Sequence, residues 1–526
     1  MGGFALKIVT NEQMSALDQS TIKDYNIPGI LLMEHASLAL MKEAVRFSRN
    51  RKINRFLICC GPGNNGGDGL ALARHLIRQQ KEVHLFLFST PDKLRDECLE
   101  NYKMLTRQTE YVYWLKGNQD IDKKALLKLL KEKMVKQTVV VDALFGTGLD
   151  RLVDGIFSQA IDKINQSDCP VISVDIPSGI QGNTGRVLGN SVKADITVSF
   201  QLPKAGNVLY PGAACNGILK IADIGIPNKL IENTSYLAMK TESKHIKEWV
   251  RCCQKNDHKG HGGTILVLAG TKGMTGAAVL AAKAAFRSGA GLVRIACEEQ
   301  LNCIYEQMFP EATTIAYSVN EYGYLTCEAK KCLEEQISIA DAIIAGPGWG
   351  KSKSRADYLE FLLDVSEKPM VLDADALNLL SENQRLFLHK KSPWIMTPHP
   401  GEMARLTGLS AEDVNSNRIE ITKKYAEKWQ STILLKGAGT VISDHHGEVW
   451  INTTGNPGMA TGGSGDVLTG IIASLYHRTN TAIHAATAAA YLHGVSGDMA
   501  ASCGMTGTIA SDLIDFLPKA FKKIIE

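Results

Sequence analysis

A glycine-rich segment of the second half combines the residues that phosphoryl transfer needs. Residues 461–465 read Thr-Gly-Gly-Ser-Gly, and Asp466 follows them at the expected start of a helix. Free backbone N–H groups at a helix N-terminus can hold phosphate oxygens, and the same end favours an ionised carboxylate. An ionised Asp466 beside phosphate could accept a proton from an attacking hydroxyl group. The alternative is a glycine-rich turn that Asp466 merely caps.

Other polar residues of the second half also follow expected strands. The segment 436–440 reads Lys-Gly-Ala-Gly-Thr and would add a cation and a hydroxyl group near a nucleotide. Asp373 ends one expected strand, and His399, which lies between two prolines, follows the next. Ligands of open α/β sheets bind beyond the carboxyl ends of the strands, where these residues are expected.

In the first half, residues 61–69 read GPGNNGGDG and are expected to join a strand to a helix. The glycines could take positive φ angles and let the backbone approach a ligand. The helix is expected to start near Asp68, with its N–H groups facing the loop. Asn64, Asn65 and Asp68 could orient a polar ligand, whereas the absence of a following Lys-Ser/Thr pair excludes a Walker A loop. A tight turn without a ligand is the alternative.

Two further loops of the first half carry carboxylates after expected strands. Asp142 precedes the turn 145–148, and Asp175 precedes the turn 177–179. Both are expected at the same sheet edge as the segment 61–69. Their carboxylate, carbonyl, amide and hydroxyl oxygens would suit a hard cation. The alternative is that each aspartate only caps a following turn or helix.

The elements that must position these residues form an alternating pattern. Short Val/Ile/Leu runs separated by 10–20 helical residues predict parallel sheets covered by helices on both faces. A capping box formed by Thr10 and Gln13 predicts an opening helix. The polar stretch 228–255 separates two large α/β domains, expected at 1–230 and 240–526. The expected strands are 56–60, 83–88, 139–144, 171–176, 196–200, 264–270, 292–297, 342–346, 370–375, 395–398 and 432–437.

Composition excludes several classes of protein among the 526 residues. The 58 Lys and Arg residues against 55 Asp and Glu residues leave a net charge of +3, which predicts neither nucleic-acid nor membrane binding. The 12 cysteines form no C-x-x-C motif, and no signal peptide or membrane-spanning run is expected, so we expect a cytoplasmic protein with reduced thiols. For His258 and His261, whose spacing is typical of metal ligands, we expect a solvated or turn role.

Together the motifs resemble the family of bifunctional NAD(P)H-hydrate repair enzymes, in which an epimerase is fused to a dehydratase. In the first half these motifs are GPGNNGGDG, VVVDALFGTGL and VDIPSG. In the second half they are KGHGGTILVLAG, TGAA, GPGWG, LDADALN, TPHPGEMARL, LKGAGT and GNPGMATGGSGD. The resemblance spans about residues 10–520 and implies a Rossmann-like epimerase domain followed by a ribokinase-like α/β dehydratase domain.

The resemblance implies repair of NADHX and NADPHX, the hydrated forms of NADH and NADPH. The first domain would interconvert their R and S epimers. The second would dehydrate the S form at the expense of ADP, giving AMP and phosphate. The implied cofactors are K⁺ for the epimerase and Mg²⁺ for the dehydratase, and the implied assembly is a homo-oligomer.

The resemblance also implies roles for individual residues, and Asp175 and Asp466 are the expected catalytic groups. In the epimerase the hydrate would contact Asn64, Asn65, Gly66, Gly67, Asp68, Gly146, Thr147, Gly148, Leu149, Asp150, Arg151, Leu152 and Asp175. The potassium ion would be bound by Asn65, Asp142 and Ser178. In the dehydratase the hydrate would contact Ala277, Gly348, His399 and Asp466. The nucleotide would contact Lys436, Gly437, Ala438, Gly439, Thr440 and Gly465.

The same residues are also compatible with two other functions. A ribokinase-like small-molecule kinase would use the same glycine-rich loop and Asp466 to make a stable phosphate ester, although it would not need the first half. A non-catalytic nucleotide-binding protein would need neither Asp175 nor Asp466.

Overall fold

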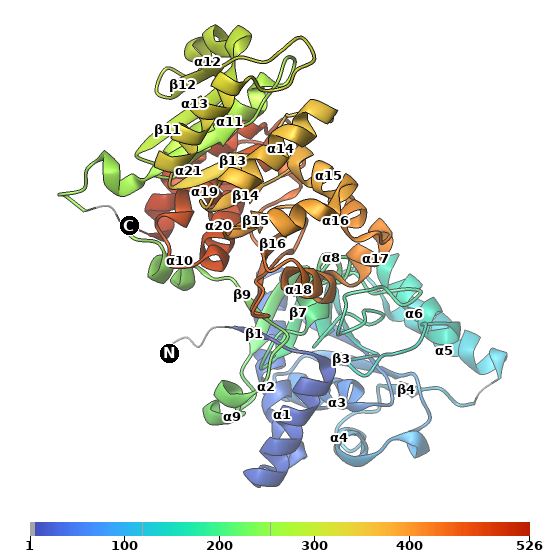
Figure 1. The fold of residues 1–526 in the computed structure, drawn as a ribbon. Coiled ribbons are helices and arrows are strands. Elements are labelled where there is room, and N and C mark those ends of the chain that lie inside the picture. The colour runs from blue at the N-terminus through green and yellow to red at the C-terminus, as the bar shows by residue number, and fades with distance from the viewer. Residues whose placement is uncertain (1–5, 118, 253, 526) are drawn as a thin grey trace. The chain divides into compact units, whose positions relative to one another are not determined.

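The computed structural model describes residues 6–117, 119–252 and 254–525. The chain divides into two compact units, one ending at Leu237 and the other beginning at Ala238 (Figure 1). Each unit has its own sheet and its own hydrophobic core, and the predicted α/β fold class is confirmed in both. Among the described residues no helix is both long and apolar enough to cross a membrane.

The first unit is built on a parallel sheet with strand order β4-β3-β2-β5-β6-β7-β8. Its strands are β1 (Lys7–Ile8), β2 (Arg55–Cys60), β3 (Glu82–Leu87), β4 (Val112–Trp114), β5 (Thr138–Ala143), β6 (Val171–Val174), β7 (Ile196–Phe200) and β8 (Ile218–Ala222). Its α-helices are α1 (Asn11–Asp24), α2 (Gly29–Asn50), α3 (Asn64–Arg78), α4 (Asp96–Leu105), α5 (Asp120–Lys133), α6 (Gly155–Asn165), α7 (Ala205–Val208), α8 (Gly212–Cys215) and α9 (Asn228–Asn233).

Alternating side chains of the first sheet enter two different cores, as the two-residue period of a strand requires. In β2, Ile58 packs with α1, α2, α3 and α4 on one face, whereas Leu57 packs with α5 and α6 on the other. Burial on both faces explains why the strands read as continuous apolar runs. The capping box at the start of α1 is confirmed, because Thr10 and Gln13 each accept a backbone N–H of the other.

The second unit has a larger sheet with strand order β9-β18-β17-β16-β15-β14-β13-β10-β11-β12. Its strands are β9 (Ala238–Lys240), β10 (Thr264–Leu268), β11 (Leu292–Glu298), β12 (Thr313–Tyr317), β13 (Ala342–Ala345), β14 (Met370–Leu372), β15 (Trp394–Met396), β16 (Thr432–Leu435), β17 (Thr440–Ser443) and β18 (Val449–Asn452). Its α-helices are α10 (Ser243–Trp249), α11 (Thr275–Arg287), α12 (Asn302–Met308), α13 (Cys327–Ile339), α14 (Lys353–Val365), α15 (Asp375–Glu382), α16 (Pro400–Thr407), α17 (Ala411–Ser416), α18 (Arg418–Lys428), α19 (Ser464–Tyr476), α20 (Ala482–Ala501) and α21 (Ala510–Ile524).

Helices cover both faces of the second sheet as well (Figure 1). Helices α11, α19, α20 and α21 share one core with Ile265 and Val267, whereas α13, α14, α15 and α18 share the other with Leu266 and Leu268. The alanine-rich α11 packs closely on α19, where a Cβ added at Gly470 would lie 2.1 Å from the Ala281 carbonyl oxygen. The close packing depends on small residues along this contact.

The prediction of wholly parallel sheets is wrong for one part of the second unit. Strands β16, β17 and β18 pair antiparallel as a meander, although β16 also pairs in parallel with β15. Strands β17 and β18 were not among the expected strands, because short turns and not helical segments join them to β16. The missed strands β8 and β12 expose much of their surface and therefore lack a continuous apolar run.

Candidate functional site

In the second unit, the loops beyond β10, β13, β14, β15 and β16 bring the predicted dehydratase residues to one edge of the sheet. A Cβ added at Gly465 would lie 3.5 Å from Lys436 Nζ and 3.7 Å from Asp373 Oδ2. The same construction at Gly348 would place a Cβ 2.9 Å from the Cβ of Ala277. Gly348 has a φ of +63°, so both its conformation and this contact favour glycine.

Asp466 lies in the first turn of α19, which begins at Ser464 after Gly463 in a left-handed conformation. Burial raises the pKa of Asp466 to about 6, with repulsion from Asp373 adding to the shift and Lys436 opposing it. The net shift is therefore opposite to the one that the helix N-terminus alone would produce. A pKa near 6 still leaves the carboxylate mostly ionised at neutral pH, where it can act as a base.

Lys436 occupies the centre of a charged network at this edge. Its Nζ lies 2.7 Å from Asp373 Oδ1 and 3.8 Å from Glu402 Oε2. Burial lowers the pKa of Lys436, but attraction to the two carboxylates outweighs burial and leaves the pKa raised. Asp373 is buried and also accepts a hydrogen bond from Thr469 Oγ1 at 3.0 Å. The ammonium group is thus held as a cation beside the glycine-rich start of α19.

The segment 436–440 turns tightly between β16 and β17. Gly437 and Gly439 have φ angles of +140° and +68°. Arg418 of α18 donates to the backbone carbonyls at the start of the turn, and burial lowers its pKa to about 10. Sequence reasoning missed Arg418, because no motif near α18 marks it. The Thr440 hydroxyl donates to the Gly437 carbonyl oxygen at 2.8 Å and so helps to close the turn.

His399 is the N-cap residue of α16 and its side chain is half exposed. Its Nδ1 accepts a hydrogen bond from the Gly401 N–H at 2.9 Å, which orients the ring. Glu402 accepts the His399 backbone N–H at 2.8 Å and completes a capping box. The accessible imidazole therefore has a fixed orientation at the same edge as Lys436.

In the first unit, the segment 61–69 is already helical from Asn64, because α3 begins there and not near Asp68. The expected positive φ angles are also wrong, since none of the glycines in this segment has one. A Cβ at Gly61 would lie 2.0 Å from the Leu144 carbonyl oxygen, and one at Gly66 would lie 2.0 Å from the Gly61 oxygen. These glycines are needed for close backbone packing.

Asn65, Asp142 and Ser178 lie together, as the sequence predicted for a cation site. Ser178 Oγ donates to Asp142 Oδ1 at 2.5 Å, and Asn65 Nδ2 donates to the Phe145 carbonyl oxygen at 3.0 Å. Ser178 Oγ also lies 3.2 Å from the Phe145 oxygen. Asp142 is fully buried, which raises its pKa, although hydrogen bonds from Ser178 oppose the shift. The backbone carbonyl oxygen of Phe145 lies beside these three residues, and sequence reasoning did not include it in the proposed cation site.

Asp175 is held in a strained left-handed conformation with a φ of +62°. Its Oδ1 accepts hydrogen bonds from Lys204 Nζ at 2.5 Å, Ser199 Oγ at 3.0 Å and the Phe200 N–H at 3.1 Å. Three donors on one oxygen stabilise the carboxylate anion. Lys204 is buried, and sequence reasoning missed it, although a lysine directly after a buried strand was a usable signal.

Asp68 and Asp18 belong to the same electrostatic cluster as Asp175 and Lys204. Burial raises the pKa of Asp68 well above its usual value, and the Asp175 and Asp18 carboxylates add to the shift. Burial also raises the pKa of Asp18 in α1 to about 6, with Lys204 opposing and Asp175 adding. In this cluster Asp175 is paired with Lys204, whereas Asp68 and Asp18 have raised pKa values and therefore hold a proton more readily. Nothing in the sequence analysis marked Asp18.

The predicted substrate loop 146–152 connects β5 to α6. The Thr147 carbonyl oxygen accepts a hydrogen bond from Asn11 Nδ2 at 2.6 Å, which ties the loop to the start of α1. Leu149 is buried in a core cluster, whereas Leu152 is 69% exposed. The Leu149 side chain therefore serves packing, and its expected contact with the hydrate stays a prediction. Gly148, Asp150 and Arg151 are exposed.

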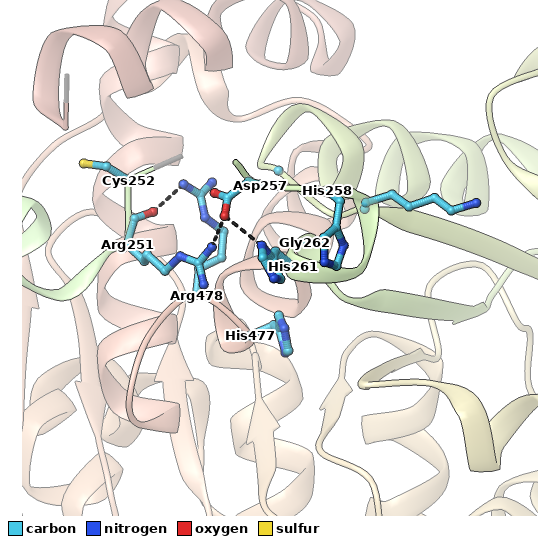
Figure 2. A pocket seen from close by; sticks show the side chains of 11 residues that line it. Arg251, Cys252, Asp257, His258, His261, Gly262, His477 and Arg478 are labelled. Atoms are coloured by element: carbon cyan, nitrogen blue, oxygen red, sulfur yellow. Dashed lines mark hydrogen bonds and ion pairs between the residues drawn. The ribbon is translucent and has the colours of Figure 1, made fainter. Parts of the chain in front are cut away.

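A separate cavity of about 220 Å³ lies at the amino end of β10, opposite the loops described above (Figure 2). Asp257 pairs there with Arg251 and with His261, and His258 accepts the Gly260 N–H. The turn role expected for His258 is thus confirmed. Arg478 donates to the Ser288 and Arg251 carbonyl oxygens and so joins separate segments. No predicted catalytic or ligand-binding residue lines this cavity.

Both halves of the chain match known protein families. The family model described as YjeF-related protein N-terminus matches residues 30–206, and the model described as NAD(P)H-hydrate dehydratase matches residues 265–519. A crystal structure of the ADP/ATP-dependent NAD(P)H-hydrate dehydratase from Bacillus subtilis, co-crystallised with ATP/Mg²⁺, is 32% identical with a TM-score of 0.47. It covers 54% of this chain and 97% of its own.

Two full-length relatives carry the same name. The bifunctional NAD(P)H-hydrate repair enzyme Nnr of Moorella thermoacetica is 39% identical and covers 99% of this chain and 97% of its own length. The Escherichia coli enzyme of that name is 33% identical and covers 88% of this chain and 84% of its own. The chain therefore belongs to the family of bifunctional NAD(P)H-hydrate repair enzymes.

Proposed function

We propose that the chain repairs hydrated NADH and NADPH in two steps. The epimerase domain, residues 1–230, interconverts the R and S hydrates. The dehydratase domain, residues 240–526, converts the S hydrate to the reduced nucleotide and converts ADP to AMP and phosphate. The observation that carries this proposal is the cluster of Asp466, Lys436 and Asp373 at the start of α19. Membership of the repair-enzyme family supports the proposal that these are the substrates of that cluster.

In the proposed dehydration, Asp466 accepts the proton of the ring hydroxyl group. The hydroxyl oxygen attacks the β-phosphorus of ADP, and the bond between that phosphorus and AMP breaks. The ring now carries a phosphate ester, which is a better leaving group than hydroxide. The bond between the ring carbon and the phosphate oxygen then breaks, the adjacent ring carbon gives its proton to the leaving phosphate, and the double bond is restored. Lys436 neutralises charge on the transferred group, and the N–H groups at the start of α19 hold its oxygens.

Magnesium fits this site as a companion of the nucleotide. Among the described residues no group of three His, Cys, Asp or Glu side chains could hold a metal ion alone. Mg²⁺ in phosphoryl-transfer sites is held mainly by substrate phosphates, waters and one or two carboxylates. Asp373, whose carboxylate lies 2.7 Å from Lys436 Nζ, could supply such a ligand. When bound, the ion would neutralise phosphate charge.

In the proposed epimerisation, the hydroxyl group loses its proton, the bond between its carbon and the ring nitrogen breaks to give a carbonyl group, and the nitrogen takes up a proton. The reverse steps on the other face of that carbon give the second epimer. This requires one group that accepts a proton and one that returns it. The Asp175 carboxylate, stabilised by Lys204, is the acceptor. Asp68, whose pKa is raised by burial and by nearby carboxylates, is the donor. Two titratable groups in different environments can divide the roles of proton acceptor and proton donor.

Potassium would bind in the epimerase beside Asn65, Asp142 and Ser178. The oxygen donors fit a hard cation. The buried Asp142 supplies the negative charge that partly compensates the ion. We further propose that the chain acts in the cytoplasm as a homo-oligomer. The cysteines that the structure describes are all free, which agrees with a reducing compartment.

One assay separates this function from its two rivals. The protein is incubated with S-NADHX and ADP, and the absorbance of the reduced nicotinamide is followed while AMP and phosphate are measured. The proposed function requires one AMP and one phosphate for each NADH recovered. Accumulation of a stable phosphate ester would support a small-molecule kinase instead, and ADP binding without any turnover would support a non-catalytic binding protein. An Asp466→Asn preparation serves as the inactive control.

A further inference from the structure

Glu402 lies between the proposed hydrate-binding and nucleotide-binding residues of the second unit. Its Oε1 lies 3.6 Å from Nε2 of His399, and its Oε2 lies 3.8 Å from Nζ of Lys436. Oε2 also accepts the His399 backbone N–H at 2.8 Å. The carboxylate therefore faces an imidazole on one side and an ammonium group on the other.

The capping box explains only part of this arrangement. A glutamine at the same helix position can also accept the N-cap N–H, so the cap does not need a negative charge. The Glu402 side chain is only 7% exposed. Burying a carboxylate costs free energy unless cationic or hydrogen-bonding groups face it. The charge of Glu402 thus points to a role beyond capping, and its partners are the two groups that would touch the two substrates.

We propose that Glu402 is a positioning residue that couples ADP binding to hydrate binding. The inference rests on the proposed function, in which Lys436 contacts ADP and His399 contacts the hydrate. When phosphate oxygens attract the Lys436 ammonium group, the Glu402 carboxylate loses part of its neutralising partner. The carboxylate then attracts the His399 imidazole more strongly and holds it in the orientation that the hydrate needs. ADP therefore tightens hydrate binding, and the hydrate tightens ADP binding by the same factor.

Asp373 keeps the Lys436 ammonium group in place when bound phosphate weakens the attraction between Lys436 and Glu402. Its Oδ1 lies 2.7 Å from the ammonium nitrogen, closer than the Glu402 carboxylate at 3.8 Å. Thr469 fixes the other Asp373 oxygen. With the ammonium group anchored, phosphate binding changes the field at Glu402 and leaves the geometry in place.

The test measures ADP affinity by calorimetry on the full-length chain, with and without saturating S-NADHX. All proteins carry Asp466→Asn, which stops turnover so that both ligands can be present. The hydrate should tighten ADP binding by about 5–50-fold in this parent, within the usual span of coupling between sites. Glu402→Gln keeps the cap and should reduce the factor to about 2 or less. Glu402→Asp, which keeps the charge on a shorter side chain, should restore part of it.

Glu412→Gln is the matched control, because it removes an exposed carboxylate from the first turn of the neighbouring helix α17. It should leave the coupling factor unchanged. Coupling retained in Glu402→Gln, or absent in a parent that binds ADP, would overturn the inference and leave the proposed function intact. A parent that binds no ADP would overturn the proposed function itself. If Glu402→Gln loses its thermal transition, the comparison of Glu402→Asp with Glu412→Gln decides the question.

Discussion

Replacing Asp466 with asparagine should separate nucleotide binding from dehydration. Asparagine is nearly isosteric with aspartate and retains a polar group in the first turn of α19, but it cannot act as a base at neutral pH. Loss of one acid–base group usually slows a reaction by about 100-fold to 10,000-fold. That loss corresponds to about 3–5 kcal/mol of transition-state stabilisation. Dehydration of the S hydrate should fall by this amount.

The charge environment of Asp466 gives the expected effect on ADP. Asp373 repels the Asp466 carboxylate and Lys436 attracts it, so this part of the site is already crowded with charge. Removing one negative charge near the phosphates should tighten ADP binding modestly. A partly exposed charge pair contributes about 0.2–1 kcal/mol, which is up to about a five-fold change in the dissociation constant.

The pH dependence of the native chain provides a second measurement of the same carboxylate. The pKa of Asp466 is raised to about 6, so the base form is lost as the pH falls through that value. At pH 7 about nine in ten Asp466 side chains are ionised, and at pH 5 only about one in ten. The dehydration rate should therefore fall about ten-fold between these two pH values, with its midpoint near pH 6. The Asp466→Asn protein should lack this transition.

The assay combines calorimetry for ADP with initial rates of both reactions on one preparation. Epimerisation should be unchanged, because Asp466 belongs to the other unit. Asp413→Asn is the matched control, since Asp413 occupies the corresponding position in the exposed first turn of α17. Near-normal dehydration by Asp466→Asn, or a flat pH profile in the native chain, would show that Asp466 is only a helix cap. The proposed phosphoryl transfer would then have to be abandoned.

Three further predictions concern the epimerase and the independence of the two units. Asp175→Asn should slow R-to-S conversion by about 100-fold or more, because it removes the proton acceptor; an unchanged rate, measured by chromatography of the epimers, would remove Asp175 from the mechanism. Exchanging K⁺ for a large organic cation should slow epimerisation by the native chain, and the Asp142→Asn rate should not depend on K⁺. A native epimerisation rate that does not change with K⁺ would refute the proposed potassium site. A fragment of residues 238–526, which keeps β9 paired with β18, should dehydrate the S hydrate and leave the R hydrate largely untouched; a folded but inactive fragment would contradict the domain assignment.

The buried strands and glycine-rich loops were accessible from the sequence because their signals are local. A run such as 139–144 is continuous and apolar because both faces of β5 are covered, and every expected strand position carries a strand. The rule that ligands bind at carboxyl ends correctly assembled Asp373, His399 and Lys436 at one edge. The antiparallel meander was missed because the expected pattern separates strands by 10–20 helical residues, whereas short turns join β16, β17 and β18.

The charge state of Asp466 shows where local reasoning fails. The helix N-terminus stabilises an anion by about 0.3–1 kcal/mol at exposed positions. Burial and the repulsion of Asp373 act in the opposite direction and shift the pKa from 3.8 to about 6, which corresponds to roughly 3 kcal/mol. The helix effect is readable from residue order, whereas burial and the approach of Asp373 exist only after folding. The larger effect was therefore the one that the sequence could not supply.

The same reasoning explains why the contacts between lysines and carboxylates could not be predicted. Lys204 and Asp175 are 29 positions apart, and Lys436 and Asp373 are 63 positions apart. In each pair the strand order places both residues at one sheet edge, but a contact at 2.5–2.7 Å also depends on loop conformation. Each lysine contacts its aspartate directly: Lys204 donates a hydrogen bond to Asp175, and Lys436 links Asp373 to Glu402. The proposed chemistry of both units thus depends on a lysine–carboxylate pair whose members come from different loops.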